Sequence, residues 1–488
     1  MDYALLLATH EAQVAASPEG ARTSRQHRLY ACLRAAILSG RIVEGTRLAS
    51  TRTLAAELGM ARNSVLYAYE QLAAEGFVHS RRQGTVVARV GLPRAPEQPP
   101  AVAPTLSRRV QSLSWPRAGA DDLLPFLPGT PALAEFPLAT WRQCLERAWR
   151  GLAPAQMGYG AVQGSRVLRQ TLAEYLRVSR GVRCSAEQVY ITDGTQDSLG
   201  VCAHALADAG DLAWIENPGY YGARAALAAA GLVLRPIRVD ADGLAPDEAD
   251  WRKAPPRLIY LTPSHQYPLG AVMSLERRLS LLAQARAAGA WILEDDYDSE
   301  FRHGSAPLPA LQGLSAEAPV VYLGTFSKTL FPALRLGYLV VPPALAPAFA
   351  SAAGALMARG RIAEQLALAE FIDAGHYTRH LRRMRRLYSE RRAALQGAIE
   401  QHLGGTVALS GGAGGLHLSV RLPPEVPDTL LSQAARGHGM VLRPLSRFAL
   451  PGTEAEHNGL VLGYGNVQSE AMDGLVRTLR RLIERVDG

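Results

Sequence analysis

The stretch that decides the fold is VVYLGTFSKTLFPALRLGYLVV, residues 320–341. It contains two apolar runs, Val320–Gly324 and Leu336–Val341, whose length and composition are typical of buried β-strands. Between them lie Thr325-Phe326-Ser327-Lys328 and, seven residues after the lysine, Arg335. Hydroxyl groups, an amine and a guanidinium directly after a buried strand indicate a ligand site, because ligands bind at strand ends in sheets of this kind.

Lysine is rare in this chain. Of the 52 basic residues only Lys253 and Lys328 are lysines, and all the others are arginines. Arginine stays protonated, whereas a desolvated lysine can lose its proton and attack a carbonyl group. Lys328 is therefore a candidate for covalent chemistry, although a lysine after a serine, taken by itself, is more often a surface residue.

Predicted helices alternate with short apolar strands from about residue 123 onward. These strands include Gln188–Thr192, Leu212–Glu216, Leu258–Thr262 and Trp291–Glu294. The alternation predicts an α/β fold with a largely parallel sheet covered by helices. After about residue 345 the chain is predicted to be helical, with a basic stretch at Arg379–Arg392, and then to form a smaller α+β segment.

Acidic residues end the strand that precedes Lys328, in Glu294-Asp295-Asp296-Tyr297. Pyridoxal phosphate needs a lysine amine for its imine, a carboxylate that keeps the pyridine nitrogen protonated, a donor to the ring hydroxyl, and a cluster that holds the phosphate. Lys328, Asp295 and Tyr297 can supply the first three groups. Part of the phosphate cluster can come from Thr325, Ser327 and Arg335.

Two further motifs suit the same cofactor. In Asp193-Gly194-Thr195-Gln196, glycine lets backbone N–H groups approach a phosphate at the start of a predicted helix. In Glu216-Asn217-Pro218-Gly219-Tyr220, the ring of Tyr220 can stack on the cofactor. Each motif is weak alone, since acidic residues at strand ends are often helix caps, but their order along successive strand ends favours a pyridoxal-phosphate site.

The first part of the chain predicts three short helices, at residues 25–39, 53–58 and 61–75, followed by a hairpin at 77–90. The third helix carries Val65, Leu66, Tyr69 and Leu72 on its expected inner face. This order is that of a winged helix-turn-helix, whose third helix enters the major groove of DNA. The candidate DNA-binding residues are Arg52, Arg62, Asn63, Ser64, Tyr67, Arg81, Gln83 and Gly84.

Charge is concentrated in the same part of the chain. Residues 22–94 contain twelve arginines and four glutamates, so their net charge equals the +8 of the whole chain. A basic segment on a neutral remainder is expected of a protein that binds the phosphate backbone, although an ordinary solvated basic face gives the same count. We expect a DNA-binding domain at 22–90, a proline-rich linker at 91–122, and a cofactor domain at 123–488.

The first segment resembles the DNA-binding domain of the GntR family of bacterial regulators. The resemblance rests on Gly45-Thr46-Arg47-Leu48, Ser50-Thr51-Arg52, Arg62-Asn63-Ser64-Val65 and Glu75-Gly76-Phe77. Ala49 departs from the pattern, because the family commonly has proline there. Residues 123–488 resemble fold type I aminotransferases with a smaller α+β C-terminal subdomain. Both parts together resemble the MocR/GabR subfamily of GntR-type regulators.

That resemblance implies pyridoxal phosphate on Lys328, a homodimer, and a loop around Tyr159 that reaches the cofactor, often across the subunit interface. In Thr262-Pro263-Ser264-His265-Gln266-Tyr267-Pro268, Tyr267 takes the place of an asparagine found in true aminotransferases. The usual carboxylate-binding arginine is also missing from 460–465. Another residue would have to bind the effector in place of this arginine. The candidates are Arg443, Arg447, Arg224 and His265, and each of the three arginines is equally plausible as a structural ion-pair residue.

Three functions are compatible with these features. The favoured one is a transcription regulator that binds double-stranded DNA and senses an amino compound, or the cofactor itself, through aldimine chemistry at Lys328. The others are a working aminotransferase with an accessory DNA-binding head, and a DNA-binding protein with a vestigial pocket; whether the domain turns over substrate stays open. Four scattered cysteines, no metal-ligand spacing and no signal or membrane segment predict a cytoplasmic protein without a metal.

Overall fold

A computed structural model describes residues 2–14, 24–81, 84–89, 105–111, 123–303, 309–358, 360–411 and 414–487. The chain forms two compact units, residues 1–105 and 106–488, and each is considered by itself. Much of the predicted linker at 91–122 lies outside the described residues, as does Gln83. None of the described helices is long and apolar enough to cross a membrane.

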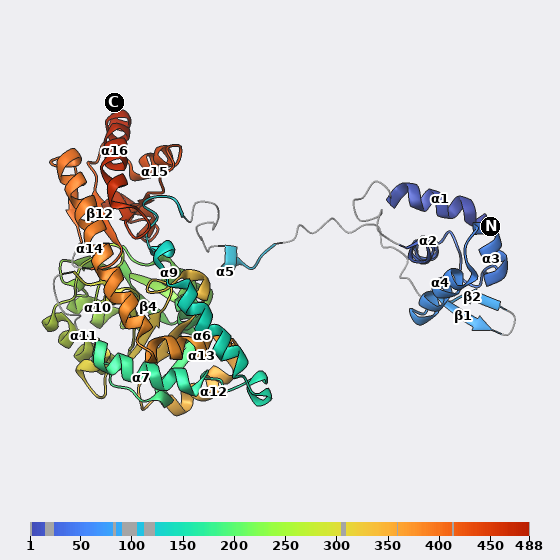
Figure 1. The fold of residues 1–488 in the computed structure, drawn as a ribbon, viewed down its shortest axis with the longest axis horizontal. Coiled ribbons are helices and arrows are strands. Elements are labelled where there is room, and N and C mark those ends of the chain that lie inside the picture. Colours follow the sequence, from blue (N-terminus) through green and yellow to red (C-terminus); the bar gives the residue numbers. More distant parts are fainter. Residues whose placement is uncertain are drawn as a thin grey trace. The chain divides into compact units, whose positions relative to one another are not determined.

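The first unit contains the helices and the hairpin that the sequence predicts (Figure 1). Ser50 begins the second predicted helix, because its hydroxyl accepts from the backbone N–H of Thr53, and Gly59 in the left-handed conformation ends it. Strands β1 and β2 pair antiparallel. The elements are α2 (Arg25–Leu38), α3 (Thr51–Leu58), α4 (Arg62–Ala74), β1 (Val78–Arg81) and β2 (Gly84–Val87).

A helix that the sequence analysis did not predict, α1 (Tyr3–Val14), packs on this unit. Tyr3 is buried in its core, its backbone N–H donates to Glu57, and its hydroxyl accepts from the backbone N–H of Ala49. One expectation for α4 is wrong: Leu66 is 42% exposed. The buried stripe of α4 runs through Val65, Ala68, Tyr69 and Leu72, at i, i+3, i+4 and i+7, so Leu66 falls outside it.

The second unit is built around an eight-stranded mixed sheet of order β3-β10-β9-β8-β7-β4-β5-β6 (Figure 1). Strands β9, β8, β7, β4 and β5 are parallel, whereas β10 pairs antiparallel with both β9 and β3. The predicted largely parallel sheet is therefore confirmed. Its strands are β3 (Val189–Thr192), β4 (Leu212–Asn217), β5 (Val233–Asp240), β6 (Gly243–Leu244), β7 (Leu258–Leu261), β8 (Trp291–Asp296), β9 (Val320–Thr325) and β10 (Gly337–Val340).

Helices pack on this sheet and bury its apolar residues in three large clusters. The strands read as nearly continuous apolar runs because both faces are covered. The helices of this part are α5 (Arg108–Gln111), α6 (Leu138–Arg150), α7 (Arg166–Arg180), α8 (Thr195–Leu206), α9 (Tyr221–Ala229), α10 (Glu248–Lys253), α11 (Leu275–Ala288), α12 (Ala346–Leu356) and α13 (Ile362–Asp373).

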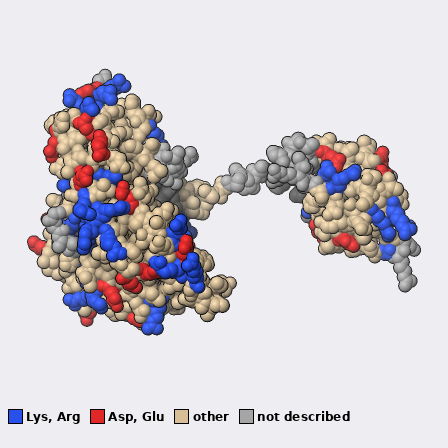
Figure 2. All heavy atoms as spheres, in the orientation of Figure 1, with Lys and Arg blue, Asp and Glu red and all other residues tan. Residues whose placement is uncertain are grey.

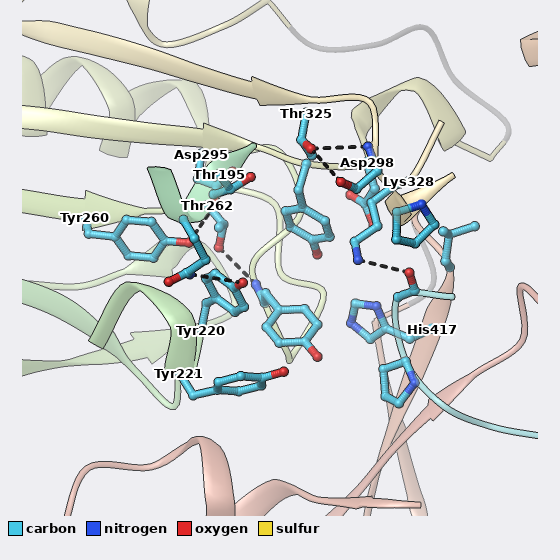
Figure 3. Close-up of a pocket in the computed structure, with 18 of the residues that line it drawn as sticks. Thr195, Tyr220, Tyr221, Tyr260, Thr262, Asp295, Asp298, Thr325, Lys328 and His417 are labelled. Atoms are coloured by element: carbon cyan, nitrogen blue, oxygen red, sulfur yellow. Dashed lines mark hydrogen bonds between the residues drawn. The ribbon is translucent and has the colours of Figure 1, made fainter. Parts of the chain in front are cut away.

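The long helix α14 (His376–Leu403) leads into a smaller α+β part, as predicted. This part has a four-stranded antiparallel sheet of order β11-β12-β14-β13, packed with two helices. Its elements are β11 (Ala408–Ser410), β12 (His417–Arg421), α15 (Asp428–Arg436), β13 (Arg443–Pro444), β14 (Gly459–Gly463) and α16 (Met472–Asp487). The first residue of β12, His417, faces the carboxyl edge of the large sheet (Figure 3).

Candidate functional site

A pocket lies where the carboxyl ends of β3, β4, β7, β8 and β9 meet, with one side closed by the start of β12 (Figure 3). Since β3 and the parallel strands point the same way, their last residues and the loops after them reach one edge of the sheet. Among the residues predicted from sequence, the pocket is lined by Lys328, Asp295, Tyr297, Thr195, Gln196, Tyr220, Thr325, Ser327 and Arg335.

The amine of Lys328 lies inside the pocket, where its Nζ donates to the carbonyl oxygen of Gly129 at 2.9 Å. Burial lowers the pKa of Lys328, and the nearby carboxylates of Asp298 and Asp295 partly offset that effect. A deprotonated amine is the nucleophile that carbonyl addition requires. Gly129 has φ +79°, a conformation that favours glycine, and a Cβ on it would lie 2.8 Å from Nζ.

Asp295, the penultimate residue of β8, has one carboxylate oxygen with a hydrogen-bond donor and one without. The hydroxyl of Tyr260 donates to Oδ2 at 2.8 Å, whereas Oδ1 is buried without a hydrogen-bond partner among the described residues. Burial raises the pKa of Asp295 to about 7. A protonated ring nitrogen at Oδ1 would satisfy this oxygen and stabilise its charge, which is what a pyridoxal site needs.

The hydroxyl of Tyr297 lies 3.0 Å from both the Nδ1 atom and the backbone oxygen of His265. Burial raises the pKa of Tyr297, and the neighbouring Asp298 adds to the shift. Tyr297 therefore stays protonated and keeps a hydrogen to donate. Its ring borders the pocket between Asp295 and Asp298, so the hydroxyl can serve a ligand there.

An anion cradle is formed at the start of α8. Gly194 has φ +97°, a conformation that favours glycine, and precedes the first turn of this twelve-residue helix. The guanidinium of Arg335 lies close by, 3.7 Å from where a Cβ of Gly194 would be. Across from it, Thr325 Oγ1 accepts from the backbone N–H of Ser327 at 3.2 Å. Helix N–H groups, hydroxyls and an arginine together suit a phosphate.

Aromatic rings form the opposite wall. Tyr220 and Tyr267 meet edge to face with centroids 6.0 Å apart, and Tyr221 stands next to Tyr220. Gln196 Nε2 donates to the hydroxyl of Tyr220 at 3.3 Å and so orients that ring. Tyr267, which takes the asparagine's place, lines the pocket as part of this wall.

The candidate effector residues lie in different surroundings. Arg224 donates to the backbone oxygen of Ala449 at 2.8 Å, and Arg447 is exposed. Arg443 is half-buried. Burial raises the pKa values of Tyr221 and Tyr267, and the charge of Arg443 partly offsets that effect, so Arg443 lies near the aromatic wall.

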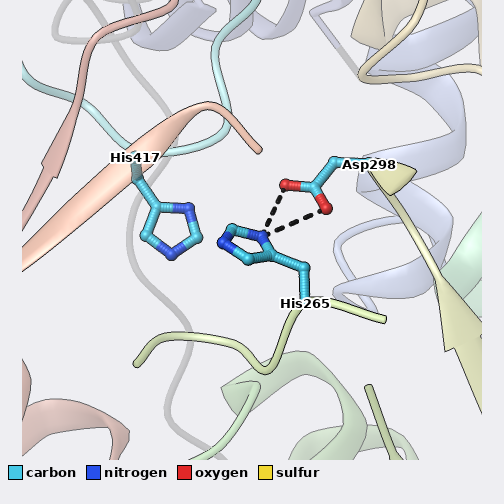
Figure 4. A group of neighbouring side chains, drawn as sticks. All are labelled: His265, Asp298 and His417. Atoms are coloured by element: carbon cyan, nitrogen blue, oxygen red, sulfur yellow. Dashed lines mark hydrogen bonds and ion pairs between the residues drawn. The ribbon is translucent and has the colours of Figure 1, made fainter. Parts of the chain in front are cut away.

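Two other predicted residues lie away from the pocket lining. His265 is buried beside Asp298, with Nδ1 3.1 and 3.2 Å from its two carboxylate oxygens (Figure 4). Tyr159 is 89% exposed in a separate hollow on the surface, together with Trp149 and Met157.

The candidate DNA-binding residues are mostly exposed. Arg62 and Asn63 open α4, Arg62 Nε lies 3.4 Å from Thr51 Oγ1, and Arg52 lies on the first turn of α3. Ser64 and Tyr67 are half-buried, while Arg81 and Gly84 flank the hairpin tip. Figure 2 shows basic side chains gathered beside the hairpin.

Sequence reasoning did not single out Arg47 as a candidate contact. Its guanidinium lies within 3.2 Å of where a Cβ of Gly84 would be, at the start of β2, and it is exposed. Its place in Gly45-Thr46-Arg47-Leu48, one of the motifs shared with the GntR family, was the signal that could have identified it.

The fold and the pocket define the class of protein: a fold type I, aminotransferase-like pyridoxal-phosphate domain joined to a winged helix-turn-helix. The family model "Aminotransferase class I and II" matches residues 131–457, and "Bacterial regulatory proteins, gntR family" matches residues 25–87. The chain belongs to the MocR/GabR subfamily of GntR-type transcription regulators.

Relatives that match over nearly the whole chain are regulators. The chain is 42% identical to the probable rhizopine catabolism regulatory protein MocR of Rhizobium meliloti, over 93% of this chain and 92% of that protein. It is 32% identical to the pyridoxine biosynthesis transcriptional regulator PdxR of Corynebacterium glutamicum, over 90% and 92%.

Among solved structures, an α-aminoadipate aminotransferase of Thermus thermophilus, complexed with N-(5'-phosphopyridoxyl)-L-leucine, is similar to the second unit. Its TM-score is 0.67 at 28% identity, over 75% of this chain and 93% of that chain. Together with the family, this neighbour indicates pyridoxal phosphate as the cofactor, and the GntR-type head makes the chain a DNA-binding transcription regulator.

Proposed function

We propose that this regulator holds pyridoxal phosphate on Lys328 and uses the pocket to sense an amino compound or the cofactor itself. The free, buried Oδ1 of Asp295 carries the proposal, because it is the atom that a cationic pyridine nitrogen would satisfy. Bound there, pyridoxal phosphate supplies an aldehyde carbon that can exchange one amine for another.

The residues of the chain have separate roles in this proposal. Lys328 supplies the deprotonated amine, and Asp295, held by Tyr260, fixes the ring nitrogen. Tyr297 donates to the ring oxygen. The phosphate is held by the start of α8, with Gly194, Thr195 and Gln196, and by Thr325, Ser327 and Arg335, while Tyr220 stacks on the ring.

An effector needs space and a group to orient it. The aromatic wall of Tyr220, Tyr221 and Tyr267 bounds that space. The charge of Arg443 acts on two of these tyrosines, which supports Arg443 as the partner of an effector carboxylate. Arg224 is engaged by a backbone carbonyl, which supports a structural role for it.

A homodimer is the assembly that fits this family, and the exposed apolar side chains around Tyr159 support it. Trp149 is 57% exposed and Met157 is 66% exposed beside that tyrosine, an arrangement expected of a surface covered by a second copy. Sedimentation equilibrium at the monomer mass of 52.4 kDa would contradict this assembly.

The domains divide the work in the proposal. Residues 22–90 bind DNA, residues 91–122 connect the two domains, and residues 123–488 sense the effector. The positive charge of the first domain supports contacts with the phosphate backbone of DNA. Bacterial operator DNA lies in the cytoplasm, so the regulator works there.

The test is the visible absorption spectrum of the purified protein before and after borohydride reduction, followed by peptide mapping. We expect a visible band that reduction removes, with the cofactor fixed on Lys328. Lys328→Ala should lose the band, whereas Lys253→Ala, which changes an exposed lysine on α10, should keep it. A reduced cofactor attached elsewhere, or no band after added pyridoxal phosphate, would overturn the assignment.

An aminotransferase activity is the second candidate, favoured by the complete set of Lys328, Asp295 and Tyr297 in one pocket. The chain is 30% identical to a 2-aminoadipate transaminase of Thermus thermophilus, over 74% of this chain and 90% of that protein. Stoichiometric oxo-acid release from an amino acid, followed by no further turnover, would separate a sensor from an enzyme.

A further inference from the structure

The strongest feature outside the cofactor's own contacts is the buried pair His265 and Asp298. His265 lies on the loop after β7 and Asp298 on the loop after β8, and both side chains are almost fully buried. Figure 4 shows the His265 ring turned with Nδ1 toward the carboxylate and its other nitrogen toward the ring of His417. Asp298 lines the pocket whereas His265 does not, and Nδ1 of His265 lies 3.0 Å from the hydroxyl of Tyr297.

The hydrogen atoms of this pair can be assigned from chemistry. An ionised carboxylate only accepts, so the two contacts of 3.1 and 3.2 Å require a hydrogen on Nδ1 of His265. Nδ1 then cannot also accept from Tyr297, although the two atoms are 3.0 Å apart. The tyrosine hydrogen is left with two acceptors: the backbone oxygen of His265, at 3.0 Å, or a ligand in the pocket.

The surrounding backbone holds the pair tightly. Gly415 has φ +80°, and a Cβ there would lie 2.2 Å from Cε1 of His265 and 2.5 Å from Oδ2 of Asp298. Gly270 approaches from the other side, 3.2 Å from Nε2 when given a Cβ. The ring of His265 therefore has little room to rotate, and the direction of its Nδ1–H is fixed by packing as well as by hydrogen bonding.

We propose that His265, held by Asp298, is a positioning residue that keeps the hydroxyl hydrogen of Tyr297 available to the ring oxygen of the cofactor. Without the imidazole, the buried carboxylate of Asp298 would lack its donor and would draw the tyrosine hydrogen toward itself. The inference rests on the proposed function, because it requires the cofactor on Lys328. It gives His265 a role other than contact with the effector.

A metal site is the competing interpretation. His265, Asp298 and His417 offer ligand atoms within 4.8 Å of one another, a donor set that suits a transition metal. Two observations favour the hydrogen-bonded pair. Both carboxylate oxygens already lie at hydrogen-bonding distance from Nδ1, and the adjoining hollow is lined by the cations Arg180 and Arg302, which disfavour a dication.

The test measures the proton affinity of the lysine-linked cofactor through its visible spectrum. A hydrogen bond from Tyr297 stabilises negative charge on the ring oxygen and so lowers the pH midpoint of the visible change. The other charged groups around Tyr297 and Lys328 stay in place in the variants. They are Asp295, Asp298 and Glu216.

We expect His265→Ala and His265→Gln to raise the midpoint by about 1 pH unit, a tenfold change in proton affinity. His265→Asn should restore the parent midpoint, because its amide nitrogen occupies the position of Nδ1. Tyr297→Phe should give the same increase, and adding His265→Ala to it should have no further effect, since His265 acts through Tyr297. Ser419→Ala is the matched control, because it also removes a buried donor to the backbone oxygen of Pro268 but does not line the pocket.

Each other outcome decides against the inference. Equal shifts for His265→Ala in the parent and in Tyr297→Phe would mean a role independent of Tyr297. A shift of the midpoint when a chelator is added, together with a similar shift in His417→Ala, would mean that these residues form a metal site. If His265→Ala does not fold, the comparison of His265→Asn with His265→Gln tests the inference in its place. Absence of a borohydride-fixed band in the parent protein would refute the proposed function and this inference with it, whereas the other contrary outcomes refute the inference alone.

Discussion

Asp295 combines burial, one hydrogen bond and one free oxygen, and at the residue scale this makes its charge costly when the pocket is empty. Burial raises the pKa of Asp295 to about 7, against an ordinary value of about 4. A raised carboxyl pKa means that the folded protein binds more protons than the unfolded chain between these values. The stability contribution is therefore present at low pH and is lost as the pH rises through about 7.

Asp295→Asn should accordingly stabilise the cofactor-free protein at pH 8, by about 2–4 °C in melting temperature, and should stabilise it less at pH 5. With pyridoxal phosphate added, the order should reverse, because a neutral amide cannot stabilise a protonated ring nitrogen. Thermal melts at both pH values provide the measurement, and Asp242→Asn, an exposed acidic position, is the control. An unchanged melting temperature at pH 8 would mean that Asp295 is not a strained buried charge.

At the same scale, Arg62 is an exposed arginine that opens α4, the helix that we propose enters the major groove. We expect Arg62→Ala to weaken binding to a duplex selected from a random pool by about tenfold or more, and to leave the cofactor spectrum unchanged. Arg34→Ala is the matched control, since Arg34 pairs with Glu75 at the opposite end of α4 and its exposed ion pair contributes little. Equal affinity for Arg62→Ala and the parent in fluorescence anisotropy would remove Arg62 from the contact set.

The elements differ in how far their sequences determine them. The strands were predictable because a strand covered on both faces, such as β9, is apolar throughout, and α3 because Ser50 and Gly59 mark its ends. Helix α1 lacks such signals. Leu5 is 65% exposed while Tyr3 is buried, so the packing face of α1 is set by contacts with residues more than 40 positions away.

The residues of the candidate site also differ in how far the sequence predicts them. Lys328, Asp295 and Tyr297 were predictable because each lies at or just after the recognisable carboxyl end of a strand. The His265–Asp298 contact joins two loops, and no local pattern places one opposite the other. Tyr260, which donates to Asp295, lies within the buried strand β7, where its sequence pattern is that of an ordinary core residue.

Helix α1 provides a prediction at this scale. Tyr3→Ala removes a buried ring and the hydroxyl that accepts from Ala49 N–H, a contact that a proline at position 49 could not make. We expect a loss of about 3 kcal/mol in the stability of the head, seen as faster hydrogen exchange in α2 and α4 of the full chain. Leu5→Ala changes an exposed apolar residue of the same helix and should leave exchange unchanged. Unchanged exchange in Tyr3→Ala would show that α1 does not support the head.

The whole molecule joins a head, in which residues 22–94 carry a net charge of +8, to a large domain that contains the pocket. A regulator of this design requires coupling: an amine that exchanges at Lys328 must change the affinity for DNA, and by linkage DNA must change the affinity for the amine by the same factor. The coupling needs no contact between effector and DNA, because a ligand that favours one state of the protein shifts the population of states.

The measurement that tests this central claim most directly is DNA affinity as a function of amine, in the parent and in Lys328→Ala. Fluorescence anisotropy on the selected duplex is run with each amine of a panel whose effect on the visible band is known. We predict that amines which shift the band change the parent's affinity by about 5-fold or more, and that none of them changes the affinity of Lys328→Ala. The same amine response in Lys328→Ala, or no response to any amine that shifts the band, would contradict the account.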